Sequence, residues 1–323
     1  MPVRSNSETL VTVYGGSGFL GRHVVRALAK RDYRIRVAVR RPELANHLQP
    51  LGRVGQIHAV QANIRNATSV EAAARDADVL INLVGILFER GRQRFEAVHT
   101  VGAEQVALAA NAHNARLVHI SALGADGNSP SLYARTKAVA EQLVHAAQPR
   151  AVIMRPSILF GPEDDFFNRF AAMARISPAL PLIGGGNTRF QPVFVGNIAA
   201  AIAKAVAGNA RAGVVYELGG PEVRTFKELM QLVLKTTQRK RLLVPVPFFV
   251  AKLQATFLQF MPRPLLTPDQ VELLRADNVV SEAAQAEGRT LHRLGIEPAP
   301  LESILPSYLW RFRKTGQFKS RAA

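Results

Sequence analysis

Short runs of β-branched and aliphatic residues alternate with longer alanine-rich stretches through the first half of the chain. The stretches at about residues 19–30, 69–75 and 95–113 lack proline and are typical of helices. The apolar runs have the length of buried strands, and strands that alternate with helices are typical of a parallel sheet covered on both faces. The pattern predicts a doubly wound, Rossmann-type α/β domain. Its expected strands are residues 9–14, 34–39, 56–62, 78–84 and 116–121.

Proline interrupts the pattern repeatedly after residue 150. We expect the Rossmann domain to comprise residues 1–155 with returning segments at about 190–220. A smaller, discontinuous C-terminal lobe is expected over residues 156–189 and 221–323. Right-handed crossovers would bring the carboxyl ends of the strands, and any bound ligand, to one edge of the sheet. Further short strands are predicted at residues 151–154, 193–195 and 214–218.

A glycine-rich turn follows the first predicted strand and opens the first predicted helix. Its spacing fits both G-x-G-x-x-G and a looser G-x-x-G-x-x-G pattern. A turn without β-carbons lets backbone amides and the helix N-terminus approach a pyrophosphate. The turn is therefore a candidate dinucleotide site, with a purely structural turn as the alternative. It contains Gly15, Gly16, Ser17, Gly18, Phe19, Leu20 and Gly21.

The second predicted strand ends in Arg40 and Arg41, where an NAD-selective site would carry an acidic residue. A carboxylate at this place would bind the ribose 2′-hydroxyl. A guanidinium suits a 2′-phosphate instead, because its planar fork donates paired hydrogen bonds to phosphate oxygens. The pair favours NADP(H) over NAD(H). The alternative is two solvated charges on a basic protein.

Tyr133 and Lys137 lie one turn apart on a helix predicted over about residues 132–145. A nearby ammonium stabilises a phenolate, so the tyrosine could exchange a proton with a carbonyl or carbinol while the lysine reaches the ribose. Ser121, at the end of the fifth predicted strand, could position a carbonyl oxygen. These three residues form the candidate catalytic group.

The glycine turn, Ser121 and the Tyr133/Lys137 pair together resemble the short-chain dehydrogenase/reductase superfamily, in its extended or atypical branch. Residues 155–162 and 191–199 resemble two later motifs of extended members. The resemblance covers most of residues 10–220. It implies a cofactor site that also includes Asn63, Leu83, Val84, Gly85, Pro156 and Ile158.

Four further segments are similar to a narrower family, that of subunit nine of the alpha subcomplex of respiratory NADH:ubiquinone oxidoreductase (complex I), in its bacterial form. This resemblance implies tight NADPH binding, with Gly15, Gly18, Gly21 and Arg40 at the phosphates and Lys137 at the ribose. It also implies partner subunits in the peripheral arm of this electron transport complex. The segments are residues 82–85, 121–124, 159–168 and 295–309.

The chain departs from active extended enzymes at two places, of which the first makes independent activity doubtful and the second puts a structural hydrogen bond in doubt. Such enzymes usually carry a catalytic Ser or Thr where this chain has Ala122 or Leu123, and often an Asp where it has Asn197. The leading hypothesis is a non-catalytic accessory or assembly subunit of complex I, in which bound NADPH stabilises the fold. The alternatives are an active NADP-dependent reductase or epimerase that uses Tyr133 and Lys137, and a sensor of the NADPH/NADP ratio.

The chain is strongly basic, with 41 Lys and Arg against 24 Asp and Glu and a formal net charge of +17. Such an excess suits nucleic acid, anionic lipid or a polyphosphate cofactor. No nucleic-acid-binding motif is recognisable, so we expect no nucleic-acid partner. The chain has no cysteine, and its eight histidines lack the spacing of a metal site on a helix, so we expect no bound metal.

Residues 247–262 form the most apolar segment of the second lobe, and residues 311–321 contain several basic residues and no acid. The first segment is either a core helix or a surface that meets the membrane or a partner. The second either contacts anionic headgroups or an acidic subunit, or is solvated. No bilayer-spanning run is recognisable, and we expect no presequence. We expect a peripheral position on the cytoplasmic side of a bacterial inner membrane, or on the matrix side in an organelle.

Overall fold

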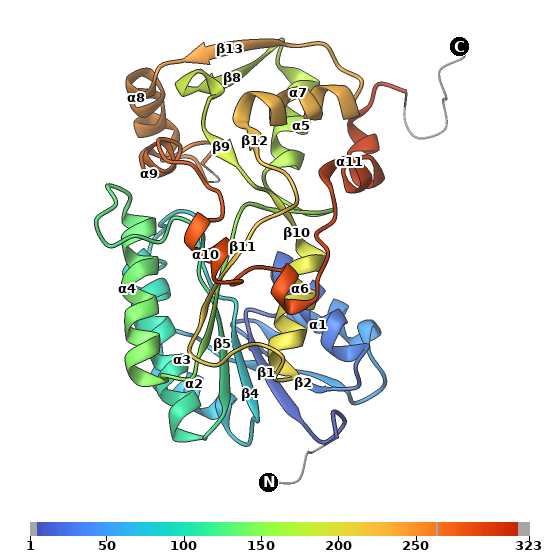
Figure 1. The fold of residues 1–323 in the computed structure, drawn as a ribbon, viewed down its shortest axis with the longest axis vertical. Helices are drawn as coiled ribbons and strands as arrows, with labels where there is room; N and C mark the ends of the chain where they lie inside the picture. Colours follow the sequence, from blue (N-terminus) through green and yellow to red (C-terminus); the bar gives the residue numbers. More distant parts are fainter. Residues whose placement is uncertain (1–4, 263, 316–323) are drawn as a thin grey trace. The chain divides into compact units, whose positions relative to one another are not determined.

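The computed structural model describes residues 5–262 and 264–315, which fall into two compact units (Figure 1). The first unit contains the described chain up to Pro156 together with Gly196–Leu218 and Glu282–Ile296. The second unit contains Ser157–Val195, Gly219–Ser281 and the described chain from Glu297 onward.

A seven-stranded sheet forms the core of the first unit, and all its strand pairs are parallel. The strand order is β11-β6-β5-β4-β1-β2-β3. The order reverses between β1 and β4, and sheets of this kind bind ligands at such a switch point. The expected doubly wound parallel sheet is thus confirmed. Its strands are β1 (Leu10–Tyr14), β2 (Arg34–Val39), β3 (Ile57–Gln61), β4 (Val79–Asn82), β5 (Arg116–Ile120), β6 (Val152–Pro156) and β11 (Val215–Leu218).

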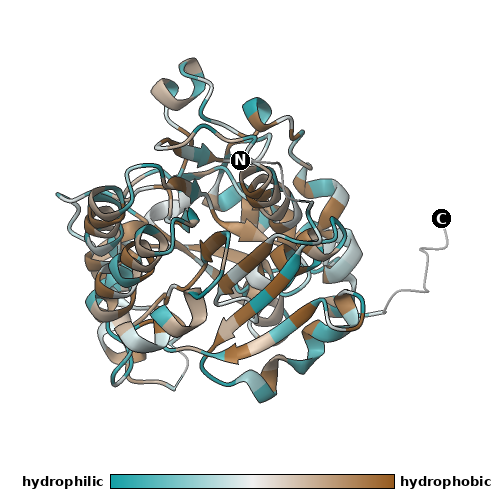
Figure 2. Ribbon diagram, turned by 90° about the horizontal axis from the view of Figure 1, so that it is seen from below, coloured by the Kyte–Doolittle hydropathy of each residue, from teal (hydrophilic) through white to brown (hydrophobic). Residues whose placement is uncertain are grey.

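Helices cover this sheet on both faces, and Figure 2 shows its hydrophobic strands lying between them. On one face, buried alanines such as Ala73, Ala107 and Ala140 let the helices pack closely against the strands. The helices of that face are α2 (Ala67–Ala74), α3 (Val101–Ala112) and α4 (Leu132–Ala147), and those of the other face are α1 (Phe19–Ala29) and α6 (Val195–Val206).

The connections differ from the sequence-based expectation in two places. Residues 95–113 do not form one α-helix, because a π-helical turn over Glu96–Thr100 precedes α3. Pro42–Leu51, for which no element was predicted, forms a 3-10 helix after β2.

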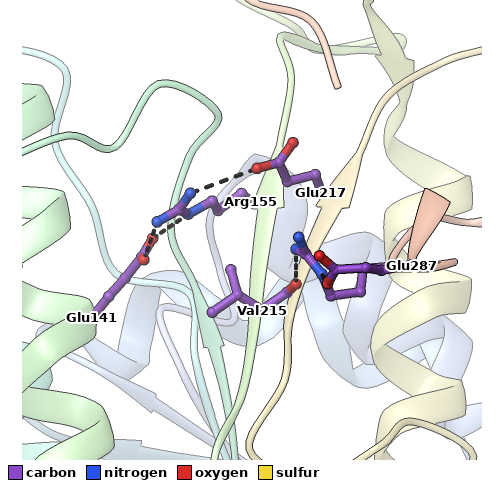
Figure 3. A network of polar contacts seen from close by, with 6 residues as sticks. Glu141, Arg155, Val215, Glu217 and Glu287 are labelled. Atoms are coloured by element: carbon purple, nitrogen blue, oxygen red, sulfur yellow. Dashed lines mark hydrogen bonds and ion pairs between the residues drawn. The ribbon is translucent and has the colours of Figure 1, made fainter. Parts of the chain in front are cut away.

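An ion-pair network ties α4 to the strands at one side of the sheet (Figure 3). Arg155 on β6 donates hydrogen bonds of 2.8 and 2.6 Å to the two carboxylate oxygens of Glu141 on α4. The same guanidinium lies 3.6 Å from Glu217 on β11. Both carboxylates are largely buried; the hydrogen bonds to Glu141 first, and then the two negative charges, raise the pKa of Arg155. The network therefore holds three charges in the interior by mutual pairing.

Glu282–Ile296 joins the first unit through contacts with β11 and includes the short helix α10 (Glu282–Ala286). Arg289 donates a 2.8 Å hydrogen bond to the carbonyl of Val215, and its own carbonyl accepts one from the amide of Glu217. The sequence had assigned this segment to the C-terminal lobe, because the partners are about 70 residues apart along the chain.

The second unit is built from three two-stranded sheets: β7 (Leu159–Phe160) with β10 (Val193–Phe194), β9 (Arg189–Phe190) with β12 (Arg224–Thr225), and β8 (Ala179–Ile183) with β13 (Leu242–Val246). Its principal helices are α5 (Phe167–Ile176), α7 (Phe226–Thr236), α8 (Phe248–Leu258) and α9 (Pro268–Leu273). Aromatic rings in mutual contact form its core. These rings belong to Phe160, Phe166, Phe167, Phe170, Phe190 and Phe226.

Asp164 anchors the short helix α12 (Pro306–Leu309) to the loop before α5. Its carboxylate accepts hydrogen bonds from the Tyr308 hydroxyl at 2.5 Å and from the amides of Gly161 and Asn168. Burial raises the pKa of Asp164 against the opposing effect of these bonds. Arg311 adds a 2.6 Å hydrogen bond to the Asn168 side chain. Residues 159–168, singled out in the sequence, thus hold the end of the described chain.

Helix α8 has one buried side and one exposed side. Ala251 and Ala255 are fully buried, whereas Phe249 (74% exposed), Leu253 (63%) and Phe257 (70%) face outward. One side of the segment is thus a core helix, and contact of its exposed side with a membrane or a partner stays a prediction. Within residues 5–262 and 264–315, no helix is both long and apolar enough to cross a membrane. Residues 316–321 of the basic C-terminal stretch lie outside the described residues.

Candidate functional site

The glycine turn lies between β1 and α1, at the carboxyl edge of the sheet. Gly15 has a φ of +80°, which favours glycine, and its amide donates to the carbonyl of Ala38. A β-carbon on Gly21 would lie 2.5 Å from the Gly15 carbonyl oxygen, so only glycine fits there. Helix α1 begins after Gly18, with neither a side-chain cap nor an acidic residue in its first turn. These features suit an anion at the helix N-terminus.

Three predicted cofactor residues lie in or just after this turn and are accessible in part. Ser17, Phe19 and Leu20 are neither fully buried nor fully exposed. They stay candidates for nucleotide contact.

Arg40 and Arg41 follow β2 directly and are exposed. Ala38, two residues earlier, accepts the hydrogen bond from Gly15, so the arginines and the glycine turn belong to the same edge of adjacent strands. Asn63 follows β3 at this edge, where its side-chain oxygen accepts a 3.2 Å bond from the Arg65 amide.

The loop after β4 lies beside the turn of α4 that carries Tyr133 and Lys137. The backbone amide of Leu83 donates to Tyr14, and that of Val84 donates to the Asn82 side chain. A β-carbon on Gly85 would lie 3.6 Å from the Lys137 Nζ atom. The backbone predicted to line the nicotinamide end is thus adjacent to the predicted ribose ligand.

Lys137 is almost completely buried on α4 and donates a 3.1 Å hydrogen bond from Nζ to the carbonyl of Ile120. Burial lowers its pKa to about 8, and the negative charge of Glu141 opposes this shift. Tyr133, one turn earlier, makes edge-to-face ring contacts with Phe95 and His99. A cationic lysine and a phenol therefore belong to one helical turn at the edge of the sheet.

Ser121 is 4% exposed, and its hydroxyl has no hydrogen-bond partner among the described residues. Pro156 ends β6, and its carbonyl accepts a hydrogen bond from Leu123. Ile158 belongs to the second unit, where it packs against the phenylalanine core. Its assignment to the cofactor site stays a prediction.

Sequence reasoning missed three buried polar residues close to Tyr133 and Lys137. His99 lies on the π-helical turn, while His119 and Asn82 lie on β5 and β4 and share a 3.2 Å hydrogen bond. Burial is the main cause that lowers the pKa of His99 to about 2 and of His119 to about 3. The only available signal was a histidine within each of two apolar segments. Among residues 5–262 and 264–315, no group of three or more metal-ligating side chains is found.

Comparison with known proteins gives results consistent with this geometry. Residues 11–219, or 209 of 323, match the NAD dependent epimerase/dehydratase family. The mitochondrial NADH dehydrogenase (ubiquinone) 1 alpha subcomplex subunit 9 of Arabidopsis thaliana is 37% identical over 325 residues, which cover 97% of this chain and 80% of that protein. Ceramide reductase of Caulobacter vibrioides is 35% identical over 179 residues, 55% of each chain.

A solved structure shares the fold. UDP-glucose 4-epimerase of Thermus thermophilus, in complex with NAD, superimposes with a TM-score of 0.68 at 19% identity, over 95% of this chain and 99% of that chain. The predicted resemblances to short-chain reductases and to the complex I subunit are confirmed. The chain belongs to the NAD dependent epimerase/dehydratase family and, within it, to the relatives of complex I alpha subcomplex subunit 9.

Proposed function

We propose that this protein is an NADPH-binding, non-catalytic accessory or assembly subunit of respiratory complex I. The observation that carries the proposal is similarity to an alpha subcomplex subunit 9 over 97% of the chain, and the glycine turn between β1 and α1 supports it. Its partners are then other complex I subunits of the peripheral arm. Bound nucleotide would stabilise the folded state by mass action.

The residues at the sheet edge fit a dinucleotide. The amides of the glycine turn and the N-terminus of α1 would hold the pyrophosphate, and Arg40 and Arg41 the 2′-phosphate. Lys137 would reach the ribose, and the backbone of residues 83–85 would face the nicotinamide. Bound NADPH supplies a hydride donor. The close contact of Gly21 with the backbone of Gly15 and Gly16 supports this fit, because the third glycine of a dinucleotide turn allows close packing of the helix.

Cofactor preference tests the arginine assignment. Replacing Arg40 and Arg41 by alanine should weaken NADPH binding at least tenfold and leave NADH binding nearly unchanged. Arg53, exposed and 3.1 Å from Asp32, provides the control substitution. Equal loss of both nucleotides would contradict a 2′-phosphate site.

Several features support the absence of turnover. The hydroxyl of Ser121 is buried, and the following positions, Ala122 and Leu123, carry no hydroxyl. A substrate carbonyl would thus lack the donor that orients it beside Tyr133.

The assembly role is tested by isolating the tagged protein from host membranes at mild salt and identifying what accompanies it. Complex I subunits are expected; recovery without any of them would contradict the role.

An NADP-dependent reductase is the second candidate function. It is favoured by the intact Tyr133/Lys137 pair and by the similarity to ceramide reductase, which spans 179 residues. Its test is oxidation of bound NADPH by long-chain or small carbonyl compounds. Turnover that disappears in Tyr133→Phe would favour the enzyme over the silent subunit.

We also propose a peripheral position at the membrane, on the cytoplasmic side in a bacterium or the matrix side in a mitochondrion. The exposed phenylalanines and leucine of α8 support this position, since an exposed apolar helix face suits the boundary of a bilayer. Flotation with anionic vesicles should recover the protein, and Phe249→Ser with Phe257→Ser should abolish recovery. Unchanged flotation of this variant would exclude α8 as the contact.

A further inference from the structure

His99 makes a hydrogen bond through each ring nitrogen. Its Nε2 atom lies 3.0 Å from the backbone N–H of Ile86, which can only donate, so Nε2 is the acceptor and carries no proton. The proton of the neutral ring is therefore on Nδ1. This atom lies 3.2 Å from the hydroxyl of Thr136. The tautomer of His99 is fixed by the Ile86 amide.

The hydrogen bonds continue from His99 into the turn of α4 that carries Tyr133 and Lys137. The Thr136 hydroxyl donates to the carbonyl of Tyr133 at 3.0 Å, so it accepts from His99 Nδ1. The bonds thus run from the Ile86 amide through His99 and Thr136 to Tyr133. They join the loop beside Gly85 to the helical turn that carries Tyr133 and Lys137.

A π-helical turn brings His99 to this position. The turn spans Glu96–Thr100, and the amide of Phe95, just before it, donates a 2.8 Å hydrogen bond to the carboxylate of Glu89. Thr100, the next residue after His99, bonds at 3.4 Å to the carbonyl of Thr136. Single π-turns within α-helices occur often at functional sites. Here the turn directs two successive side chains at one residue of α4.

The groups around His99 keep its ring neutral, which preserves the two hydrogen bonds to Ile86 and Thr136. Lys137 on α4 and His119 on β5 act on the ring electrostatically, and Tyr133 contacts its edge at 5.3 Å between centroids. Burial and the Lys137 charge lower the pKa of His99 to about 2, so the ring is uncharged at neutral pH. A missing β-carbon on Gly85 leaves space beside both Lys137 Nζ and His99 Nε2.

We propose that His99 is a positioning residue, which locks the loop at residues 83–86 to the Tyr133–Lys137 turn and so sets the geometry of the nicotinamide end of the site. This inference rests on the proposed nucleotide site. His99 itself need not touch the nucleotide, because it acts through Ile86 on one side and Thr136 on the other.

The test compares His99→Leu with His99→Gln. Leucine keeps the approximate volume but removes both hydrogen bonds, whereas glutamine keeps an acceptor and a donor. NADPH affinity is measured by fluorescence titration from pH 6.5 to 9.5. Leucine should weaken binding about tenfold and move the pH midpoint set by Lys137, while glutamine should recover most of the affinity. Wild-type affinity and midpoint in His99→Leu would overturn the proposal.

Two further measurements keep the result interpretable. If His99→Leu does not fold, Thr136→Val removes only the hydroxyl link and should produce the same loss of affinity and shift of midpoint; wild-type behaviour would overturn the proposal. Failure of the wild type to bind any nucleotide would contradict the proposed function. In that case the link through His99 is tested by hydrogen exchange at the Ile86 amide, which should lose protection in His99→Leu. Unchanged protection would overturn the positioning role of His99.

Discussion

The two units of this protein obtain their order from different sources. In the first, a seven-stranded parallel sheet supplies the order through backbone hydrogen bonds, and polar side chains gather at the ends of its strands. In the second unit the strands have only two to five residues, so their backbone hydrogen bonds contribute little. Ring contacts among phenylalanines and the hydrogen bonds of Asp164 hold its segments together instead.

The difference extends to what each unit presents to its surroundings. The first unit presents a glycine turn and two exposed arginines, which suit a small polyanion. The second presents the exposed aromatic side of α8, which suits a bilayer or another protein. Surface substitutions in the first unit should therefore affect nucleotide binding, and those in the second should affect contact with a bilayer or another protein.

The largest expected effect is at the Arg155 network of the first unit. Arg155→Leu leaves the carboxylates of Glu141 and Glu217 buried without their cation, and should lower the free energy of unfolding by about 3–5 kcal/mol. Chemical denaturation measures this loss. Arg53→Leu breaks an exposed pair with Asp32 and should cost less than about 1 kcal/mol. Equal effects of the two substitutions would contradict the assigned role.

Acid should weaken the first unit through its two buried histidines. The pKa of His99, about 2, and of His119, about 3, lie below the ordinary value of 6.5, so the unfolded chain binds protons that the folded chain does not. Stability present above pH 6.5 is therefore lost as the pH falls towards 3, by roughly 2 kcal/mol for each histidine at pH 5. His99→Gln should reduce the slope of stability against pH. A slope identical to that of the wild type would refute the contribution of His99.

The corresponding substitution in the second unit is Tyr308→Phe. It removes one of the donors to buried Asp164 and should lower the free energy of unfolding by about 1–3 kcal/mol. Thermal or chemical denaturation measures the change. Ser307→Ala, next to it and exposed, should change stability by less than about 0.5 kcal/mol. If both variants behave alike, the Asp164 anchor is unimportant.

Nucleotide affinity should depend on pH through Lys137. Its pKa of about 8 lies below the usual 10.5, so the ammonium is present at neutral pH and is lost as the pH rises through 8. NADPH binding should weaken by about tenfold between pH 7 and 9.5. Lys137→Met should bind weakly at both values, without this pH dependence. A wild-type affinity that is constant over the range would exclude a charged lysine at the ribose.

The smallest effect on stability is expected at α8. Phe257→Ser removes an aromatic ring that is 70% exposed and should change the free energy of unfolding by less than about 0.5 kcal/mol. Ala255→Ser at a fully buried position of the same helix should cost more. A large decrease in the free energy of unfolding in Phe257→Ser would mean that this side of α8 belongs to the core.

Much of the first unit was predictable, because its buried strands are short continuous apolar runs and crossover handedness then limits their order. The glycine turn, Arg40 and the Tyr133/Lys137 pair could be proposed from the sequence because each chemical role needs a fixed spacing, and their roles stay predictions. The role of His99 was not predictable. A histidine within an apolar helix gives no sign of the π-turn that directs it at Thr136.

The rest depended on contacts distant in sequence. Arg155 meets Glu141 and Glu217 only after three elements assemble, and the bond between Arg289 and Val215 joins segments that local pattern assigns to different lobes. In the second unit, overall hydropathy could not tell the buried Ala251 side of α8 from its exposed Phe249 side.

The central claim is that the first unit carries NADPH as a structural element. The most direct test is to purify the protein without added nucleotide, identify what it releases by mass spectrometry and absorbance, and then challenge the loaded protein with aldehydes and ketones. We predict bound NADPH that survives every carbonyl compound. Oxidation on challenge that is lost in Tyr133→Phe, or the absence of any nucleotide, would contradict the account.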